Sequence, residues 1–232
     1  MRTRRGDSPG NPLPLRGTSQ QVGWTDLVPA PVEANVGRNY IEVRDKQLRA
    51  LNSALDTLSA ESVQLVSLRH YGRAKGKYEN FALLDEGGVY DGATPDPYTV
   101  PRNGERYFTL PDELFRRGWI HVLDDSELIL LMMIALRSGL DGMVKFTSQE
   151  RVLHFGFGRD SYEAHRTLSA FGLIQAHSIN RHEDGRVIDY NPKHQRRDLH
   201  LHQFRLIDAG FDAEPLTQVQ HVLQRKLNHS GK

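Results

Sequence analysis

Cysteine is absent from the 232-residue chain, which excludes disulfides, thiolate metal sites and cysteine nucleophiles. Long apolar runs are also missing. The longest extends from Leu128 to Leu136, far short of the ~20 residues that a membrane-spanning helix needs. The first residues are basic, but no apolar stretch follows them as in a secretory signal. We therefore expect a cytoplasmic protein that makes no membrane contact.

Two further features are scarce. The net charge is only +1, so any surface for nucleic acid must be a local patch. A glycine-rich phosphate loop is lacking, because Gly156 and Gly158 lie between two expected helices and not after a strand. We expect no cofactor, and we assign no residue as a metal ligand.

Composition and periodicity divide the chain into four parts. Residues 1–39 are rich in Pro, Gly, Ser and Gln, which predicts a disordered N-terminal tail. Residues 40–107 are predicted to hold a helix and a small β-hairpin with loops. Residues 108–207 form the principal domain, and residues 208–232 form a C-terminal helix. The predicted fold class is α+β.

Leucine stripes mark the two outer helices. Leu48, Leu51, Leu55 and Leu58 recur at helical spacing, with Ser59 or Ser62 as an interruption. In the C-terminal helix, one face carries Leu216, Val219, Leu223 and Leu227. Packing on the domain core is the commoner role of such a stripe. A homodimer seam through Leu48, Leu51 and Leu55, or through Leu216, Val219 and Leu223, is the alternative.

The principal domain begins with well-marked helices. Asp124 followed by Glu127 has capping-box spacing, and the apolar residues 128–136 predict a helix buried on most sides. Thr147 or Ser148 caps a second helix that runs to about Phe155. A third helix covers 159–170. Beyond it, strand-like residues 173–180 and 199–207 flank a long polar loop.

The third helix has two distinct faces. Ala164, Leu168 and Phe171 are spaced to face the first helix, and Gly172 lets the backbone leave the helix. The opposite face then presents Arg159, Tyr162, Glu163 and Arg166. Arginine and tyrosine near the N-terminal end of such a helix can reach base edges and phosphates in a major groove.

The stretch "FTSQERVLHFG…RDSYEAHRTLSAFGLI", with the surrounding residues 124–207, resembles the winged helix-turn-helix family of bacterial DNA-binding proteins. The preceding "YFTLPDELFRRGWIHVLDDSELILLMM" is similar to the lead-in of winged-helix plasmid replication initiators. The resemblance implies a winged-helix core with flanking helices and double-stranded DNA as the partner. The sequence departs from the family pattern at His165, where a larger aliphatic residue is usual, and at the acidic Asp160 and Glu163.

The residues expected to contact DNA come from three places, of which the third helix is the first. Lys145 and Gln149 lie near the start of the second helix, and a basic wing spans 181–197 around Asp184-Gly185. The complete set of predicted DNA-binding residues is Lys145, Gln149, Arg159, Tyr162, Arg166, Arg186, Arg196 and Arg197. The segment "RHYGRAKGKY" at 69–78 is an alternative phosphate-contacting patch or a basic loop.

An enzymatic function is the least favoured hypothesis. His200-Leu201-His202 resembles the metal-binding strand of rolling-circle replication nucleases, but no tyrosine follows it to attack a phosphate. We expect binding without catalysis and leave open whether these two histidines hold a metal. A transcriptional regulator is the first expectation and a plasmid or mobile-element replication initiator is the alternative. A protein-interaction winged helix without DNA binding is a further alternative.

Overall fold

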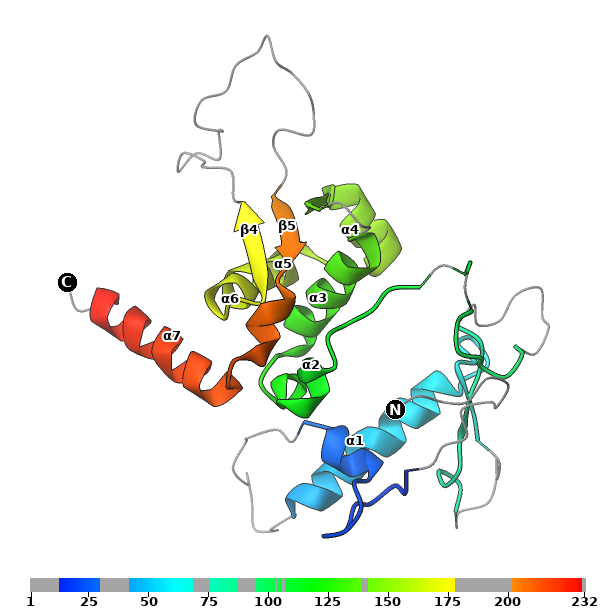
Figure 1. Ribbon diagram of the computed structural model, residues 1–232. Helices are drawn as coiled ribbons and strands as arrows, with labels where there is room; N and C mark the ends of the chain where they lie inside the picture. Colours follow the sequence, from blue (N-terminus) through cyan, green and yellow to red (C-terminus); the bar gives the residue numbers. More distant parts are fainter. Residues whose placement is uncertain are drawn as a thin grey trace. The chain divides into compact units, whose positions relative to one another are not determined.

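The computed structural model describes residues 13–29, 42–68, 76–86, 95–102, 104–105, 107–138, 142–177 and 202–230. The described residues form an α+β structure in which helices predominate and strands build small antiparallel sheets (Figure 1). The chain divides into two compact units, Met1–Arg106 and Tyr107–Lys232. This division falls beside the predicted limit after residue 107.

The first unit contains a short helix, a long helix and a two-stranded sheet. Its elements are η1 (Trp24–Leu27), α1 (Val43–Leu58), β1 (Val66–Ser67) and β2 (Ala82–Leu83). β1 and β2 pair antiparallel. The chain then returns beside β2, since Tyr98 N–H donates to Leu83 O at 3.0 Å. The predicted hairpin is consistent with this return, although its turn, predicted at 85–88, lies partly outside the described residues, which omit 87–94.

Part of the predicted disordered tail is ordered. Within 13–29, the backbone N–H groups of Trp24 and Thr25 donate to Pro14 O and Leu15 O, each at 2.9 Å. The Trp24 ring lies 5.2 Å from the Phe81 ring, centre to centre. The prediction of disorder is therefore wrong for these residues, because a few apolar side chains outweigh the polar average of the segment. The rest of 1–39 lies outside the described residues.

The leucine stripe of α1 packs into the core of its own unit. Leu51 and Leu55 are buried there with Val66, Leu68 and Phe81. The helix ends at Ser59, one of the two residues predicted to interrupt it. A homodimer seam through Leu48, Leu51 and Leu55 is therefore not supported, since Leu51 and Leu55 are covered within the unit and Leu48 is half-buried.

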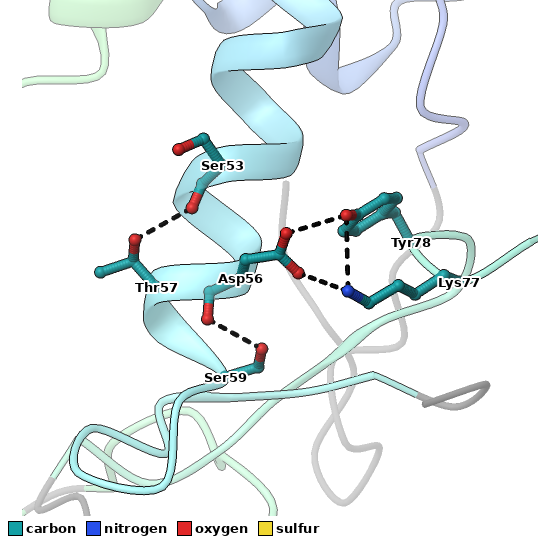
Figure 2. A network of polar contacts seen from close by, with 6 residues as sticks. All are labelled: Ser53, Asp56, Thr57, Ser59, Lys77 and Tyr78. Carbon is teal, nitrogen blue, oxygen red and sulfur yellow. Dashed lines mark hydrogen bonds and ion pairs between the residues drawn. The ribbon is translucent and has the colours of Figure 1, made fainter. Parts of the chain in front are cut away.

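A polar network joins α1 to the segment before β2 (Figure 2). Lys77 Nζ lies 2.7 Å from Asp56 Oδ1, and the Tyr78 hydroxyl donates to Asp56 Oδ2 at 2.9 Å. The hydrogen bond from Lys77 holds the pKa of Asp56 below its usual value. Lys77 and Tyr78 thus tie the segment before β2 to α1 through one carboxylate. Residues 69–75 of the predicted basic patch lie outside the described residues.

The second unit alternates helices with short strands. Its elements are α2 (Glu113–Arg116), η2 (Trp119–His121), α3 (Asp125–Arg137), β3 (Val144–Lys145), α4 (Ser148–Phe155), α5 (Arg159–Tyr162), α6 (Ala164–Ala170), β4 (Ile174–His177), β5 (Gln203–Leu206), η5 (Asp208–Asp212) and α7 (Pro215–Ser230). β3, β5 and β4 form an antiparallel sheet with β5 in the centre. β4 and β5 agree with the predicted strands, whereas β3 was not predicted.

One hydrophobic core unites the sheet with the helices. Phe204 of β5 pairs with Val144 of β3 and with Ala176 of β4, and its side chain is fully buried. α3 packs on α6 and on β5 (Figure 1). Besides Phe204, the large side chains that are fully buried in this core are Trp119, Phe146, Leu130, Leu131, Ile134, Leu168, Leu173, Ile174 and Phe211.

The predicted helix starts are confirmed at atomic detail. Asp124 Oδ1 accepts from Glu127 N–H at 2.8 Å, and Glu127 Oε2 accepts from Asp124 N–H at 3.0 Å. Thr147 and Glu150 repeat this reciprocal capping box at α4. Burial raises the pKa of Glu127 above its usual value, against the hydrogen bond from Asp124 that lowers it.

Two helices bury different faces from those predicted. α3 was predicted to be buried on most sides, but Ile129, Met132 and Leu136 are exposed. In α7, Val222 is buried and Val219 packs against the core, whereas Leu216 and Leu223 are exposed. The predicted face of α7 is therefore divided, because its valines turn toward the unit and its leucines turn toward solvent.

The exit from α6 depends on two glycines. Gly172 has φ +78°, a left-handed conformation that glycine adopts without strain. Leu173 N–H donates back to Leu168 O at 3.0 Å, as in a glycine-terminated helix. The carbonyl of Gly172 lies so close to Gly210 that a Cβ at Gly210 would collide with it. The predicted role of Gly172 is confirmed.

Candidate nucleic-acid interface

α4, α5 and α6 form two helical arms joined by a tight turn. Gly156 has φ +61° at the end of α4, and Phe157 N–H donates to Arg151 O at 2.8 Å. The buried Arg151 side chain connects α4 to the turn, since its guanidinium donates to Gly158 O at 3.2 Å and to Ser148 Oγ at 3.3 Å. The turn thus separates α4 from α5 and α6.

The predicted third helix consists of two segments. α5 ends at Tyr162, α6 begins at Ala164, and Glu163 lies between them in a turn. A single helix over 159–170 is therefore wrong. The inward residues of α6 are as predicted, because Ala164, Leu168 and Phe171 are all buried.

Tyr162 does not belong to the exposed face. Its side chain is only 8% exposed, and the Arg151 guanidinium carbon lies 3.9 Å from its ring centre. Burial raises the pKa of Tyr162 to about 12, with the nearby Arg151 charge opposing the rise. The predicted contact of Tyr162 with DNA is wrong, because the phenol is buried against Arg151 and is not on the exposed face.

Four predicted contact residues are exposed. Lys145 ends β3, Gln149 lies in the first turn of α4, Arg159 begins α5, and Arg166 lies in α6. The Arg166 side chain is 76% exposed and its Nε lies 2.7 Å from Glu163 Oε2. Solvent screens such a surface pair, so Arg166 can exchange Glu163 for another anion at little cost.

The surface around these residues is chemically mixed. Asp160 and Glu163 are exposed beside the arginines, as the sequence predicted. On α4, Val152 and Leu153 are 54% and 68% exposed. This surface of α4, α5 and α6 therefore combines cationic, acidic and apolar side chains, and the cations come from several elements.

The wing residues lie beyond the described structure. β4 and β5 pair from Ile174 with Leu206 to His177 with Gln203, which is the base of a hairpin. Arg186, Arg196 and Arg197, the predicted wing contacts, fall in 178–201, outside the described residues. Their position in the sequence assigns them to the connection between these two strands.

Aromatic and imidazole rings gather beneath the base of the hairpin. The ring centres of His165 and His202 are 5.0 Å apart, and the Tyr162 ring lies 5.5 Å from His165. His200 lies outside the described residues. Across the described ranges, no three His, Asp or Glu side chains are grouped so that they could hold a metal ion.

Sequence reasoning noticed His165 as a departure but missed its neighbour Arg151. His165 is 5% exposed and Arg151 is 7% exposed, and both lie inside the helix-turn-helix. Arg151 lies one turn after Thr147 in α4, and nothing in the residue pattern distinguishes this position from a solvent-facing one.

In the part of the chain that the structure describes, no helix combines the length and apolar character needed to cross a bilayer. No family model, curated protein or solved structure matches this chain.

Proposed function

We propose that the second unit is a winged helix-turn-helix domain that binds double-stranded DNA. The observation that carries the proposal is the order of its elements together with the pairing of its strands. α3, β3, α4, α5–α6, β4 and β5 follow one another, and the first strand pairs with the last. This is the arrangement implied by the family that residues 124–207 resemble.

The exposed face of α5 and α6 would enter the major groove. Helix-turn-helix proteins place the N-terminal part of the second arm against base edges. Arg159 and Arg166 are exposed there, and arginine offers two donors that match guanine. Lys145 and Gln149 would contact phosphates, and Arg186, Arg196 and Arg197 would add contacts from the wing.

A transcriptional regulator is the first role that we propose, and a plasmid or mobile-element replication initiator is the alternative. A regulator binds a single operator, whereas an initiator binds iterated repeats. The exposed leucines of α7 offer a face on which two copies could pair, and a two-fold protein would enrich a palindrome.

One observation favours the further alternative, a protein-interaction module. Ile129, Met132 and Leu136 form an exposed apolar stripe along α3, at 38%, 40% and 52% exposure. A groove lined in part by Tyr107, Phe108 and Leu136 lies at one end of this stripe. Apolar surfaces of this kind commonly contact other proteins.

The test is a binding titration of the full chain with random duplex DNA and with a sequence enriched from a random pool. We expect binding that weakens steeply with salt, because phosphate contacts release counterions. Arg159→Ala combined with Arg166→Ala should cost about 2–6 kcal/mol on the enriched sequence, at roughly 1–3 kcal/mol for each contact.

Arg116→Ala is the matched control. Arg116 is 74% exposed and paired with Asp112 within one helical turn, much as Arg166 is paired with Glu163. Its removal should leave DNA affinity unchanged. If the wild type shows no binding at low salt, the DNA proposal is wrong and protein partners become the function to pursue.

A further inference from the structure

A side chain replaces a helix hydrogen bond at the break between α5 and α6. In a continuous α-helix, Arg166 N–H would donate to Tyr162 O. Here it donates to Glu163 O at 2.9 Å, and Tyr162 O pairs with Nδ1 of His165 at 2.6 Å. Because a carbonyl only accepts, Nδ1 carries the hydrogen. The break therefore leaves no orphaned acceptor at Tyr162.

The imidazole of His165 is held on several sides. Its ring centre lies 5.5 Å from that of Tyr162, 5.0 Å from that of His202 and 5.7 Å from that of Phe204. Phe204 lies in β5 and His202 is the residue just before that strand, where the chain returns from the connection after β4. The side chain is 5% exposed. Packing thus fixes the donor and links the break to the base of the hairpin.

The break decides how Arg159 and Arg166 are placed relative to each other. In an unbroken helix, residues seven apart lie on one face, about 10 Å apart along the axis. In this protein the two arginines occupy separate segments, α5 and α6. The turn between them is closed by hydrogen bonds that span three residues, from Glu163 N–H to Asp160 O and from Arg166 N–H to Glu163 O. Any contact that fixes this turn fixes the spacing of the two guanidinium groups.

We propose that His165 is a positioning residue for sequence recognition, acting through its hydrogen bond to Tyr162 O. This inference rests on the proposed DNA-binding function. The imidazole does not touch DNA. It holds α5 and α6 in the arrangement that matches both arginines to one base sequence, and without its N–H the two arginines still attract phosphates but no longer select the sequence.

Three substitutions separate this role from simple filling of the core. His165→Asn keeps an N–H donor at the position of Nδ1. His165→Gln carries its amide one bond further from the backbone, and His165→Leu keeps apolar volume with no donor. Leu123→Ala, in the same hydrophobic core, is the control for lost stability alone.

The measured quantity is discrimination, the ratio of the dissociation constants for random duplex and for the enriched sequence at one salt concentration. We expect His165→Leu and His165→Gln to lower it about ten-fold or more, with random-duplex affinity changed less than about three-fold. His165→Asn should retain discrimination within about three-fold, and Leu123→Ala should retain it despite a lower Tm.

Each other result overturns the proposal. Full discrimination in His165→Leu or His165→Gln means that the imidazole only fills space. Equal loss in His165→Asn means that the hydrogen bond is not the cause. Absence of DNA binding by the wild type overturns the proposed function as well, so failure of this inference alone is recognised by a wild type that discriminates.

Discussion

The guanidinium carbon of Arg151 lies 3.9 Å from the centre of the Tyr162 ring. Arg151 is only 7% exposed, and its guanidinium N–H groups also donate to Gly158 O and Ser148 Oγ. α4, the turn and α5 are therefore joined by one buried cation. Such a residue combines a cation–π contact with charged hydrogen bonds in a site that excludes water.

Removal of this cation should destabilise the second unit. We expect Arg151→Ala to lower the free energy of unfolding by about 2–4 kcal/mol, since it removes the stacking contact and leaves Gly158 O without this donor. Denaturant unfolding followed by circular dichroism measures the change. Arg116→Ala, at an exposed pair, should change it by less than about 0.5 kcal/mol. Similar values for both variants would contradict the role of Arg151.

Tyr162→Phe distinguishes the buried position of this residue from the contact predicted by the sequence. The hydroxyl is buried, and it has no hydrogen-bond partner among the described residues. We expect the variant to be as stable as the wild type within about 1 kcal/mol, or more stable, because an unpaired buried hydroxyl is removed. DNA affinity should not change. A loss of affinity with unchanged stability would return Tyr162 to the interface.

Stability should fall between about pH 10 and pH 12. Tyrosine in the unfolded chain ionises near pH 10, whereas burial raises the pKa of Tyr162 to about 12 in the folded unit. The unfolded state therefore loses its proton first, and the stability present below pH 10 is lost as the pH rises through 12. Urea midpoints across this range give the slope, and Tyr162→Phe should flatten it. An equal slope in the variant would assign the dependence to other groups.

Gly210→Ala should be strongly destabilising, because its Cβ would meet the backbone carbonyl of Gly172, which cannot rotate away. We expect a loss of about 2–3 kcal/mol, as for overpacking in a core. Gly158→Ala is the matched control, since Gly158 has φ −70° and no atom within 4 Å of the added Cβ. Thermal unfolding of both variants makes the comparison, and an unchanged Tm for Gly210→Ala would contradict the close approach.

Local chemistry made much of the second unit predictable. The caps at Asp124 and Thr147 depend on side chains three residues apart, and Gly172 depends on one backbone conformation. These signals need no knowledge of the tertiary fold. The alternation of apolar and polar residues over 199–207 is likewise local, and it predicts the strand that contains β5.

The missed features depend on contacts distant in sequence. β3 is a two-residue strand, too short for any periodicity, and its pairing with β5 defines it. The prediction that Tyr162 faces outward treats 159–170 as one helix, whereas in the structure Tyr162 is buried in contact with Arg151 of α4. In α7, two apolar stripes compete, and the docking of Pro215 and Val222 decides which one is buried.

The hydrogen bond from Trp119 Nε1 to Phe211 O, at 3.0 Å, joins residues 92 positions apart. Contacts of such long sequence separation form late and slow the folding of a domain. A fragment restricted to 124–177 would lack both of these residues and the central strand that contains Phe204. The helix-turn-helix is thus expected to fold only together with its two flanks, as one cooperative transition and not as a separable module.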